Sequence, residues 1–387
     1  MQIDKKINDL PLTKSNPETL VSLFGKADIV PMWVADMEFQ IAEPIQQALI
    51  QRISNSGFGY EYKPESFFNA QKKWYKETYQ IDISKIDVLF SPSIITTISI
   101  LLENFSSENA GIIIQPPVFM GFRNVIRNTN RRIVNNPLKL INNKYKIDFE
   151  DLEKKAKFEN NKVLIICNPH NPVGRVWTKQ ELGNIIRICK ENNLLLFSDE
   201  IHKDIILFNN QFTSALKFID EYKNIAVCTS EAKTFNLCGI SDSLAIIPNE
   251  DIRNSVSAAF KKYNLGRTNA LTRVALEAAY TNGGLWLEDV IKTVESNIES
   301  IEEELESSKI QLVKPEGTYQ VWLDFRNVYK DTKEMFNHLT KNTGIGLNAG
   351  HWFGKEGALF MRMNIATSNE KVKDSIKKIK KTVAKNE

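Results

Sequence analysis

The chain has 387 residues and a net charge of +3 at pH 7, with 42% hydrophobic and 25% charged residues. These values are typical of a globular protein with two or three domains, or with one large domain and a smaller partner. Nucleic-acid binding is not expected, because it requires concentrated basic charge. We find neither a secretory signal nor an apolar stretch approaching the roughly 20 residues that a membrane helix needs. We therefore expect a cytoplasmic protein without a membrane partner.

The cysteines and histidines do not suggest a metal site. The four cysteines form no CxxC pair, and the four histidines show no HExxH spacing. Three of the cysteines lie inside or beside apolar runs, which is typical of buried free thiols in a reducing compartment.

The middle of the chain alternates between strand-like and helix-like segments. The capping box Thr178-Lys179-Gln180-Glu181 predicts the start of a helix that continues to Cys189. Short apolar runs, typical of strands buried on both faces, occupy residues 88–90, 111–114, 163–167, 194–197, 225–228 and 244–247. This alternation predicts a mainly parallel sheet with helices on both faces.

The C-terminal part has a different pattern. Residues 285–307 carry spaced apolar side chains, from Leu285 to Ile301, among many acids and predict one long exposed helix. Residues 318–325 and 360–365 alternate as strands do, and residues 372–383 predict a helix whose apolar stripe packs on the protein. A membrane-surface helix is the less favoured interpretation of this last segment.

Three of the central runs end in polar clusters that contain Asn171, Asp199 and Lys233. Because ligands bind outside the carboxyl ends of parallel strands, we expect these side chains to meet. Pyridoxal phosphate (PLP) chemistry needs such a set: an amine for the covalent link, a carboxylate for the pyridine nitrogen and a donor for the ring oxygen. Any of the three alone would more often be a surface or turn residue.

The chain resembles the fold-type-I PLP enzymes of the aspartate aminotransferase superfamily. More narrowly, it is similar to the MalY/PatB group of cystathionine β-lyases, also called carbon–sulfur β-lyases. The Val-Ala-Asp-Met segment at residues 34–37 separates that group from ordinary aminotransferases. The matching motifs cover residues 31–39, 58–60, 167–174, 198–202, 230–236, 317–319 and 362–366.

The resemblance implies an α/β fold whose large domain has a mainly parallel, seven-stranded sheet sandwiched by helices, with a smaller α+β domain beside it. Residues 1–50 would form an N-terminal arm and part of the small domain, residues 51–284 the large PLP-binding domain, and residues 285–387 the C-terminal small domain. It also implies a homodimer with shared active sites.

The resemblance also implies roles for individual residues. Lys233 would bind PLP through its ε-amine and then remove the substrate Cα proton. Asp199 would pair with the pyridine nitrogen and so keep the ring an electron sink. Asn171 and His202 would donate to the ring hydroxyl oxygen, and Phe119 would stack on the ring.

The PLP phosphate would be bound by backbone amides and hydroxyls. The amides of Ile94 and Ile95, at the start of a helix, and the hydroxyl of Ser230 are the expected donors. Tyr60 would reach the cofactor and substrate from the neighbouring protomer, and Tyr62 is a rival for this role because it lies only two residues away.

The expected substrate contacts centre on Arg362, which would bind the α-carboxylate in a bidentate pair. Main-chain groups of Val34 and Ala35 would contact the same carboxylate. Met120 would line the space for the substituent on the substrate sulfur.

The chain departs from the family pattern at three places. Ser93 stands where the family usually has glycine, so the phosphate loop is expected to differ slightly. Phe119 and Met120 replace two tyrosines, and Met120 is expected to widen an apolar pocket for bulky substituents. Ser241 stands near the position of a phosphate-binding arginine of many relatives.

The implied activity is β-elimination from cystathionine or other S-substituted L-cysteines, giving a thiol, pyruvate and ammonia. An aminotransferase on the same fold is the first alternative, and a regulatory binding protein is another. The spacing of Ser230 and Lys233 also matches the SxxK pattern of penicillin-binding serine hydrolases, but Ser241-Asp242-Ser243 replaces their SDN motif and no KTG follows.

Overall fold

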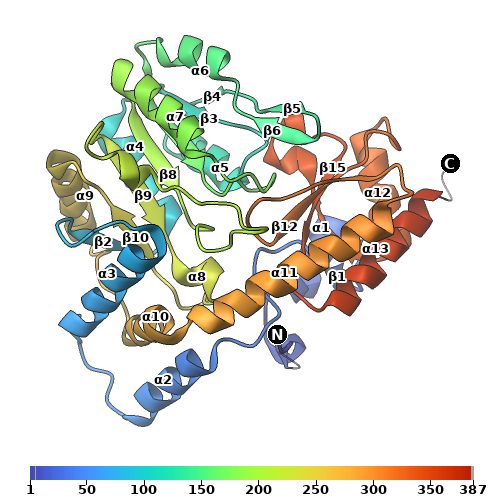
Figure 1. The fold of residues 1–387 in the computed structure, drawn as a ribbon, viewed down its shortest axis with the longest axis horizontal. Helices are drawn as coiled ribbons and strands as arrows, with labels where there is room; N and C mark the ends of the chain where they lie inside the picture. The colour runs from blue at the N-terminus through green and yellow to red at the C-terminus, as the bar shows by residue number, and fades with distance from the viewer. Residues whose placement is uncertain (5, 385–387) are drawn as a thin grey trace.

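The computed structural model describes residues 1–4 and 6–384. Its centre is a seven-stranded sheet, visible in cyan to yellow in Figure 1, with the strand order β2-β10-β9-β8-β7-β3-β4. Every neighbouring pair is parallel except those of β10, which runs antiparallel to both β2 and β9. The strands are β2 Val88–Ser91, β3 Gly111–Ile114, β4 Arg132–Asn135, β7 Asn161–Cys167, β8 Leu195–Asp199, β9 Ile225–Thr229 and β10 Ser243–Ile246. The predicted strands and mainly parallel sheet are thus confirmed.

Helices cover both faces of this sheet, as predicted. One face packs against α4 Ile94–Phe105, α5 Met120–Asn128 and α9 Glu250–Lys262, and the other against α6 Phe149–Ala156 and α7 Lys179–Glu191. The capping box forms at the start of α7: Glu181 N donates to Thr178 Oγ1 at 3.1 Å, and Thr178 N donates to Glu181 Oε2 at 2.8 Å.

A second, four-stranded antiparallel sheet lies in the orange and red part of Figure 1, with the order β11-β12-β15-β14. Its strands are β11 Gln311–Val313, β12 Gln320–Asp324, β14 Asn348–Ala349 and β15 Phe360–Asn364. The helices of this part are α11 Gly284–Leu305, α12 Thr332–Thr343 and α13 Asn369–Ala384. Both predicted C-terminal strands and the predicted last helix are present.

The long helix α11 differs from the prediction in its exposure. Its apolar stripe, which includes Val290, Val294 and Ile298, is fully buried, and its mainly polar, acidic face meets solvent. Leu285, which seemed to belong to the stripe, is 78% exposed. The helix is therefore amphipathic and contributes to the core. Tertiary contacts cover its apolar stripe, and the local sequence pattern does not show which segments make those contacts.

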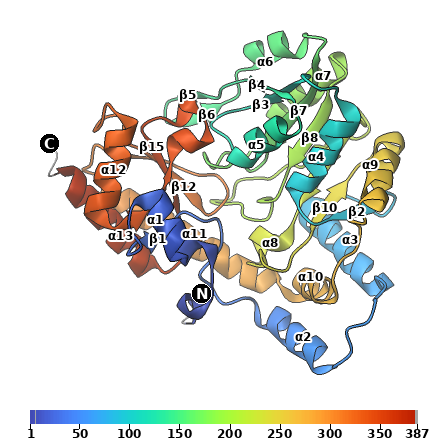
Figure 2. The same cartoon turned by 180° about the vertical axis from the view of Figure 1, so that it is seen from behind.

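The N-terminal segment crosses to the C-terminal part of the chain. Strand β1 Val30–Pro31 pairs in parallel with β13 Ile345–Gly346, and Figure 2 shows β1 and α1 beside α12 and α13. The remaining helices are α1 Pro17–Phe24, α2 Glu43–Ser54, α3 Glu65–Tyr79, α8 Glu231–Thr234 and α10 Ala270–Asn282. A hairpin of β5 Lys139–Ile141 and β6 Lys144–Lys146 and short 3₁₀ helices complete the fold.

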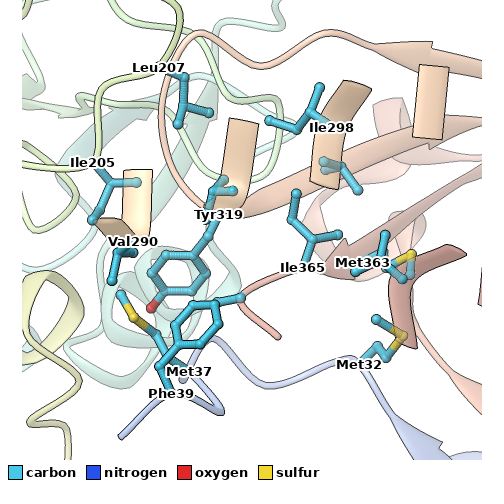
Figure 3. Close-up of a cluster of buried hydrophobic side chains, with 14 of the residues drawn as sticks. Met32, Met37, Phe39, Ile205, Leu207, Val290, Ile298, Tyr319, Met363 and Ile365 are labelled. Atoms are coloured by element: carbon cyan, nitrogen blue, oxygen red, sulfur yellow. The ribbon is translucent and has the colours of Figure 1, made fainter. Parts of the chain in front are cut away.

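A buried cluster joins these parts (Figure 3). Met32, Met37 and Phe39 of the N-terminal segment pack with side chains of α11 and of the second sheet, and each is 2% exposed. Tyr319, which is fully buried, points into the same cluster. The cluster holds residues 32–39 across the molecule, and Trp33, Val34 and Ala35 of this segment form one wall of the cavity described below.

The described helices include none with the length and apolarity needed to cross a membrane. All four cysteines are free: Cys167, Cys189 and Cys228 are buried, as expected, whereas Cys238 is exposed. Among the described residues, no group of His, Cys, Asp and Glu side chains could hold a metal ion.

Candidate active site

A cavity of about 430 Å³ lies at the carboxyl ends of β7, β8 and β9. The strand register aligns these ends, because Cys167 pairs with Asp199 and Asp199 pairs with Cys228. The sequence-predicted residues that line the cavity are Val34, Ala35, Ile94, Ile95, Phe119, Met120, Asn171, Asp199, His202, Ser230, Lys233 and Arg362. The cavity therefore gathers side chains that lie up to 329 positions apart, in segments that the fold brings together.

Lys233 lies on α8, the short helix that follows β9. Its Nζ donates to the carbonyl of Ala35 at 2.6 Å and lies 3.5 Å from Cys238 Sγ. No carboxylate of the described residues forms an ion pair with it. The amine is thus directed across the cavity toward the N-terminal segment.

Asp199 ends β8 and is 4% exposed. Its Oδ1 accepts a hydrogen bond from the amide of Ile201 at 3.0 Å, and it has no ion-pair partner among the described residues. Burial raises the pKa of this carboxyl to about 7. An unpaired buried carboxylate facing a cavity is suited to a cationic ligand group.

His202 and Asn171 flank the same space. His202 is 2% exposed, and its Nδ1 has no hydrogen-bond partner among the described residues. Its ring packs edge to face against the Tyr319 ring, with their centroids 5.8 Å apart. Burial, reinforced by Lys233 and Arg362, lowers its pKa to about 3, so the imidazole is neutral at pH 7. The amide oxygen of Asn171 accepts from Arg362 Nη1 at 3.1 Å.

The start of α4 forms the anion-binding side of the cavity. Ser93 Oγ accepts from the amide of Thr96 at 3.1 Å, and in the described part of the chain the amides of Ile94 and Ile95 have no acceptor. Free first-turn amides form an anion site at a helix N-terminus. Ser93 has φ −161° and ψ 158°, an extended conformation that any residue adopts.

Two hydroxyls stand opposite this helix. Ser230 Oγ donates to the carbonyl of Asp242 at 2.7 Å, and Ser241 Oγ lies 3.1 Å from it. Ser230 shows no hydrogen bond to Lys233, so the nucleophile–base contact of an SxxK hydrolase is not formed. Ser241 also lines the cavity.

Phe119 and Met120 form an apolar wall. The Phe119 and Phe122 rings pack edge to face, with their centroids 5.6 Å apart. A Cβ on Gly121 would lie 2.3 Å from the Phe119 ring, so this glycine makes room for the ring. The sequence carried no signal for this contact, because it depends on the rotamer of Phe119.

Arg362 lies on β15 and is 5% exposed. Its Nη2 donates to the carbonyl of Trp33 at 2.6 Å and to Asn348 Oδ1 at 2.7 Å, whereas its buried Nε has no partner among the described residues. Desolvation lowers its pKa to about 10. With only neutral partners, the guanidinium is suited to bind an incoming carboxylate.

Asn348 was not predicted as a site residue, and only the antiparallel pairing of β14 with β15 places it opposite Arg362. Asn236 was likewise missed, although it stands in the quoted 230–236 motif. Its side chain accepts from the amide of Met37 at 3.0 Å and donates to the carbonyls of Met37 and Phe39. It therefore fastens the Lys233 segment to the N-terminal segment.

Val34 and Ala35 contribute backbone to the cavity wall. The carbonyl of Val34 accepts from Asn364 Nδ2, and that of Ala35 accepts from Lys233 and from the hydroxyl of Tyr319. A contact of these residues with a substrate carboxylate stays a prediction.

Tyr60 and Tyr62 do not line this cavity. They are 98% and 83% exposed and border a different hollow together with Arg267 and Arg273. The Arg267 guanidinium lies 5.3 Å from the centre of the Tyr60 ring. A role for either tyrosine in the cavity would therefore require a second copy of the chain.

The residues of the cavity fit a PLP-like group. They offer a lysine amine, an unpaired buried carboxylate, a neutral histidine with an orphaned nitrogen, free helix amides, an aromatic wall and a buried arginine. The lysine, the carboxylate and the arginine have no ion-pair partner among the described residues, and His202 Nδ1, Arg362 Nε and the amides of Ile94 and Ile95 have no hydrogen-bond partner there.

The comparisons with known proteins agree with this geometry. The cystathionine beta-lyase PatB of Bacillus subtilis is 34% identical over 98% of this chain and 99% of its own length. Cystalysin from Treponema denticola, whose structure contains pyridoxal 5'-phosphate, is 31% identical, with a TM-score of 0.93 over 100% of this chain and 99% of that one. The PLP-bound C-S lyase from Staphylococcus hominis is 29% identical, with a TM-score of 0.89 over 98% and 96% of the two chains.

The family model for aminotransferase class I and II matches residues 38–379. That span includes both sheets and every cavity residue discussed above except those of the Trp33–Ala35 wall. The chain belongs to the class I and II aminotransferase family.

Proposed function

We propose that the chain is a PLP-dependent carbon–sulfur β-lyase that cleaves cystathionine or other S-substituted L-cysteines to a thiol, pyruvate and ammonia. The observation that carries the proposal is the full-length similarity to a cystathionine beta-lyase together with one cavity that holds Lys233, Asp199 and Arg362.

The cofactor would be held by residues that lack partners of their own. Lys233 would bind it covalently, and Asp199 would pair with its pyridine nitrogen. Asn171 and His202 would donate to its ring oxygen, with Phe119 against the ring face. The phosphate would bind the amides of Ile94 and Ile95 and the hydroxyls of Ser230 and Ser241. When bound, PLP supplies an electron sink for the charge left on the substrate Cα.

The substrate would be oriented by its α-carboxylate on Arg362. The carbonyl of Trp33 and the amide oxygen of Asn348 hold the guanidinium in place before the substrate arrives. The unpartnered Nε would donate to one carboxylate oxygen, and a bidentate pair would form when Nη2 exchanges its bond to Trp33 or Asn348 for the second oxygen. Such preorganisation lowers the entropic part of the barrier.

The proton on Cα would be taken by Lys233 Nζ. This amine points across the cavity and is held by only a neutral carbonyl and a thiol, so it can exchange these contacts without breaking an ion pair. The Cβ–S bond would then break as a Cα–Cβ double bond forms, and the sulfur would leave as a thiolate that takes up a proton. Water would hydrolyse the released enamine to pyruvate and ammonia.

We also propose a cytoplasmic homodimer with shared active sites. The exposed aromatic and basic hollow around Tyr60 is suited to contact a second copy, and Tyr60 of the partner subunit would then complete the cavity. The boundaries near residues 50 and 284 are our proposal for the domains, supported by α11, which starts at Gly284, and by the pairing of β1 with β13.

The test is a product assay on the purified protein loaded with PLP. With cystathionine or an S-alkylcysteine, a lyase releases pyruvate and thiol in equal amounts. If the protein instead forms glutamate from an amino donor and 2-oxoglutarate, with no thiol release, it is an aminotransferase and the proposal fails. Lys233→Ala should abolish the visible absorbance of the bound cofactor and both activities, and borohydride should label Lys233 in the wild type.

A further inference from the structure

A buried charged cluster lies directly behind the cavity and has no part in the chemistry proposed above. Lys203 and Glu231 are 1% and 0% exposed, and Lys203 Nζ lies 2.7 Å from Asp204 Oδ2 and 3.5 Å from Glu231 Oε1. Burying three charged side chains together is costly unless they satisfy one another. We therefore ask which segments of the chain this cluster holds in place.

Asp204 is the centre of this cluster. Its Oδ2 accepts from Lys203 and from Thr234 Oγ1, each at 2.7 Å. Its Oδ1 accepts from Trp74 Nε1 at 3.1 Å and from the hydroxyl of Tyr79. Although burial opposes ionisation, Lys203 and the other donors outweigh it and lower the pKa of Asp204, so the hub stays charged at pH 7.

The partners of this hub flank the cavity residues in the sequence. The turn after β8 directs His202 into the cavity, while Lys203 and Asp204 point into the interior. On α8, Lys233 faces the cavity, and its neighbours Ala232 and Thr234 are buried, with Thr234 bonded to the hub. Each of the two segments thus presents one face to the cavity and the other to Asp204.

The segment that carries Lys233 has little stability of its own. Helix α8 has 4 residues, too few to be stable without tertiary contacts. We propose that Asp204, paired with Lys203, is a positioning residue for Lys233, acting through Thr234 on α8. This inference rests on the proposed function, because positioning matters only if Lys233 reacts.

The sharpest test is Thr234→Val, which removes the hydroxyl bond to Asp204 and conserves the shape of the side chain. Asp204→Asn is less informative, because it removes the nearest counter-charge of the buried Lys203 and risks unfolding. Thr129→Val is the matched control: Thr129 is also buried and its hydroxyl donates to the carbonyl of Val125 at 2.8 Å, at the end of α5 remote from Lys233. Thr234→Ser keeps the hydroxyl and is the conservative variant.

Two measurements on the full-length protein decide the question. With an S-alkylcysteine, Thr234→Val should lower kcat about tenfold with KM changed less than about twofold, because Arg362 binds the substrate from another wall. Deuterium exchange of the peptide around α8, which needs no catalysis, should become faster in Thr234→Val. Thr234→Ser should restore both values, and Thr129→Val should change neither.

Any other pattern overturns the proposal. An unchanged kcat, an unchanged exchange of α8, or equal effects of Thr129→Val would show that the cluster only stabilises the fold. If the wild type has neither lyase nor aminotransferase activity, the proposed function fails, and the exchange comparison still decides whether Asp204 holds α8.

Discussion

Two buried aspartates five positions apart show the difference between the cavity and the interior. Asp199 and Asp204 are 4% and 6% exposed. Asp199 accepts one hydrogen bond, from the amide of Ile201, and burial raises its pKa to about 7. Asp204 accepts from four donors, and its pKa is lowered because Lys203 and the other donors outweigh burial. One carboxylate is left for a ligand, and the other is satisfied by the protein.

The two lysines of the same region differ in the same way. Lys203 is ion-paired with Asp204 and Glu231, whereas Lys233 contacts only a carbonyl and a thiol. Asp199 and Lys233 thus both lack an ion-pair partner among the described residues, although burying an ionisable group without one is expensive in a folded protein. Such a set persists where a ligand supplies the missing partner.

The largest effect should come from removing the unsatisfied carboxylate. Asp199→Asn should lower kcat/KM for an S-substituted cysteine by about 10³-fold, because it removes charge stabilisation inside a largely buried site. Steady-state kinetics of the PLP-loaded variant measure this loss. A circular dichroism spectrum like that of the wild type would show that folding is intact, and retention of more than about a tenth of the activity would contradict the assignment.

Replacing Asp204, the carboxylate that the protein satisfies, should instead lower the stability of the fold. Asp204→Asn should lower the free energy of unfolding by about 3–5 kcal/mol, because Lys203 then remains buried with its nearest counter-charge removed. Urea unfolding followed by circular dichroism gives this value. A loss below about 1 kcal/mol would mean that the contacts of Asp204 with Lys203 and its other donors contribute little to the free energy of unfolding.

The contrast should also appear in the pH dependence of the PLP-free protein. The native Asp199 carboxyl keeps its proton up to about pH 7, whereas an unfolded aspartate loses it near pH 4. The native state therefore binds more protons in this window, so Asp199 makes the free energy of unfolding fall as the pH rises.

Asp199→Asn removes this contribution. Its stability relative to the wild type should therefore rise by about 2.5 kcal/mol from pH 5 to pH 8. Urea unfolding of both proteins across this range measures the difference, in which the contributions of the buried histidines cancel. A difference that does not vary with pH would contradict the raised pKa.

The smallest effect concerns the apolar wall of the cavity. Met120→Tyr should lower the ratio of kcat/KM for a bulky S-aryl conjugate to that for a small S-alkyl conjugate by about fivefold, because the larger ring narrows the pocket. Met120→Leu, which nearly conserves volume, is the control. If the ratio is unchanged in Met120→Tyr, the widened-pocket hypothesis is wrong.

Much of the fold could be predicted from local pattern. Continuous apolar runs such as Val163 to Cys167 indicate strands covered on both faces, and the Thr178–Glu181 capping box marks the start of α7. The positions of Asn171, Asp199 and Lys233 at or just beyond strand ends predicted a shared cavity. In the structure, all three residues line the same cavity. Their catalytic roles stay predictions.

Other parts could not be predicted, because they depend on contacts between distant segments. The burial of one face of α11 follows from packing against the N-terminal segment and the second sheet. The place of Asn348 beside Arg362 follows from strand register, and that of Asn236 beside Met37 from a crossing of two loops.

The sequence by itself indicated six strands of the large sheet, two C-terminal strands and the helices α7, α11 and α13, because apolar periodicity and capping are local properties. Only the tertiary structure decided which charged groups are satisfied. Asp199 and Asp204 look alike in the sequence, and their different surroundings arise because one side of the turn faces a cavity and the other faces α8 and α3.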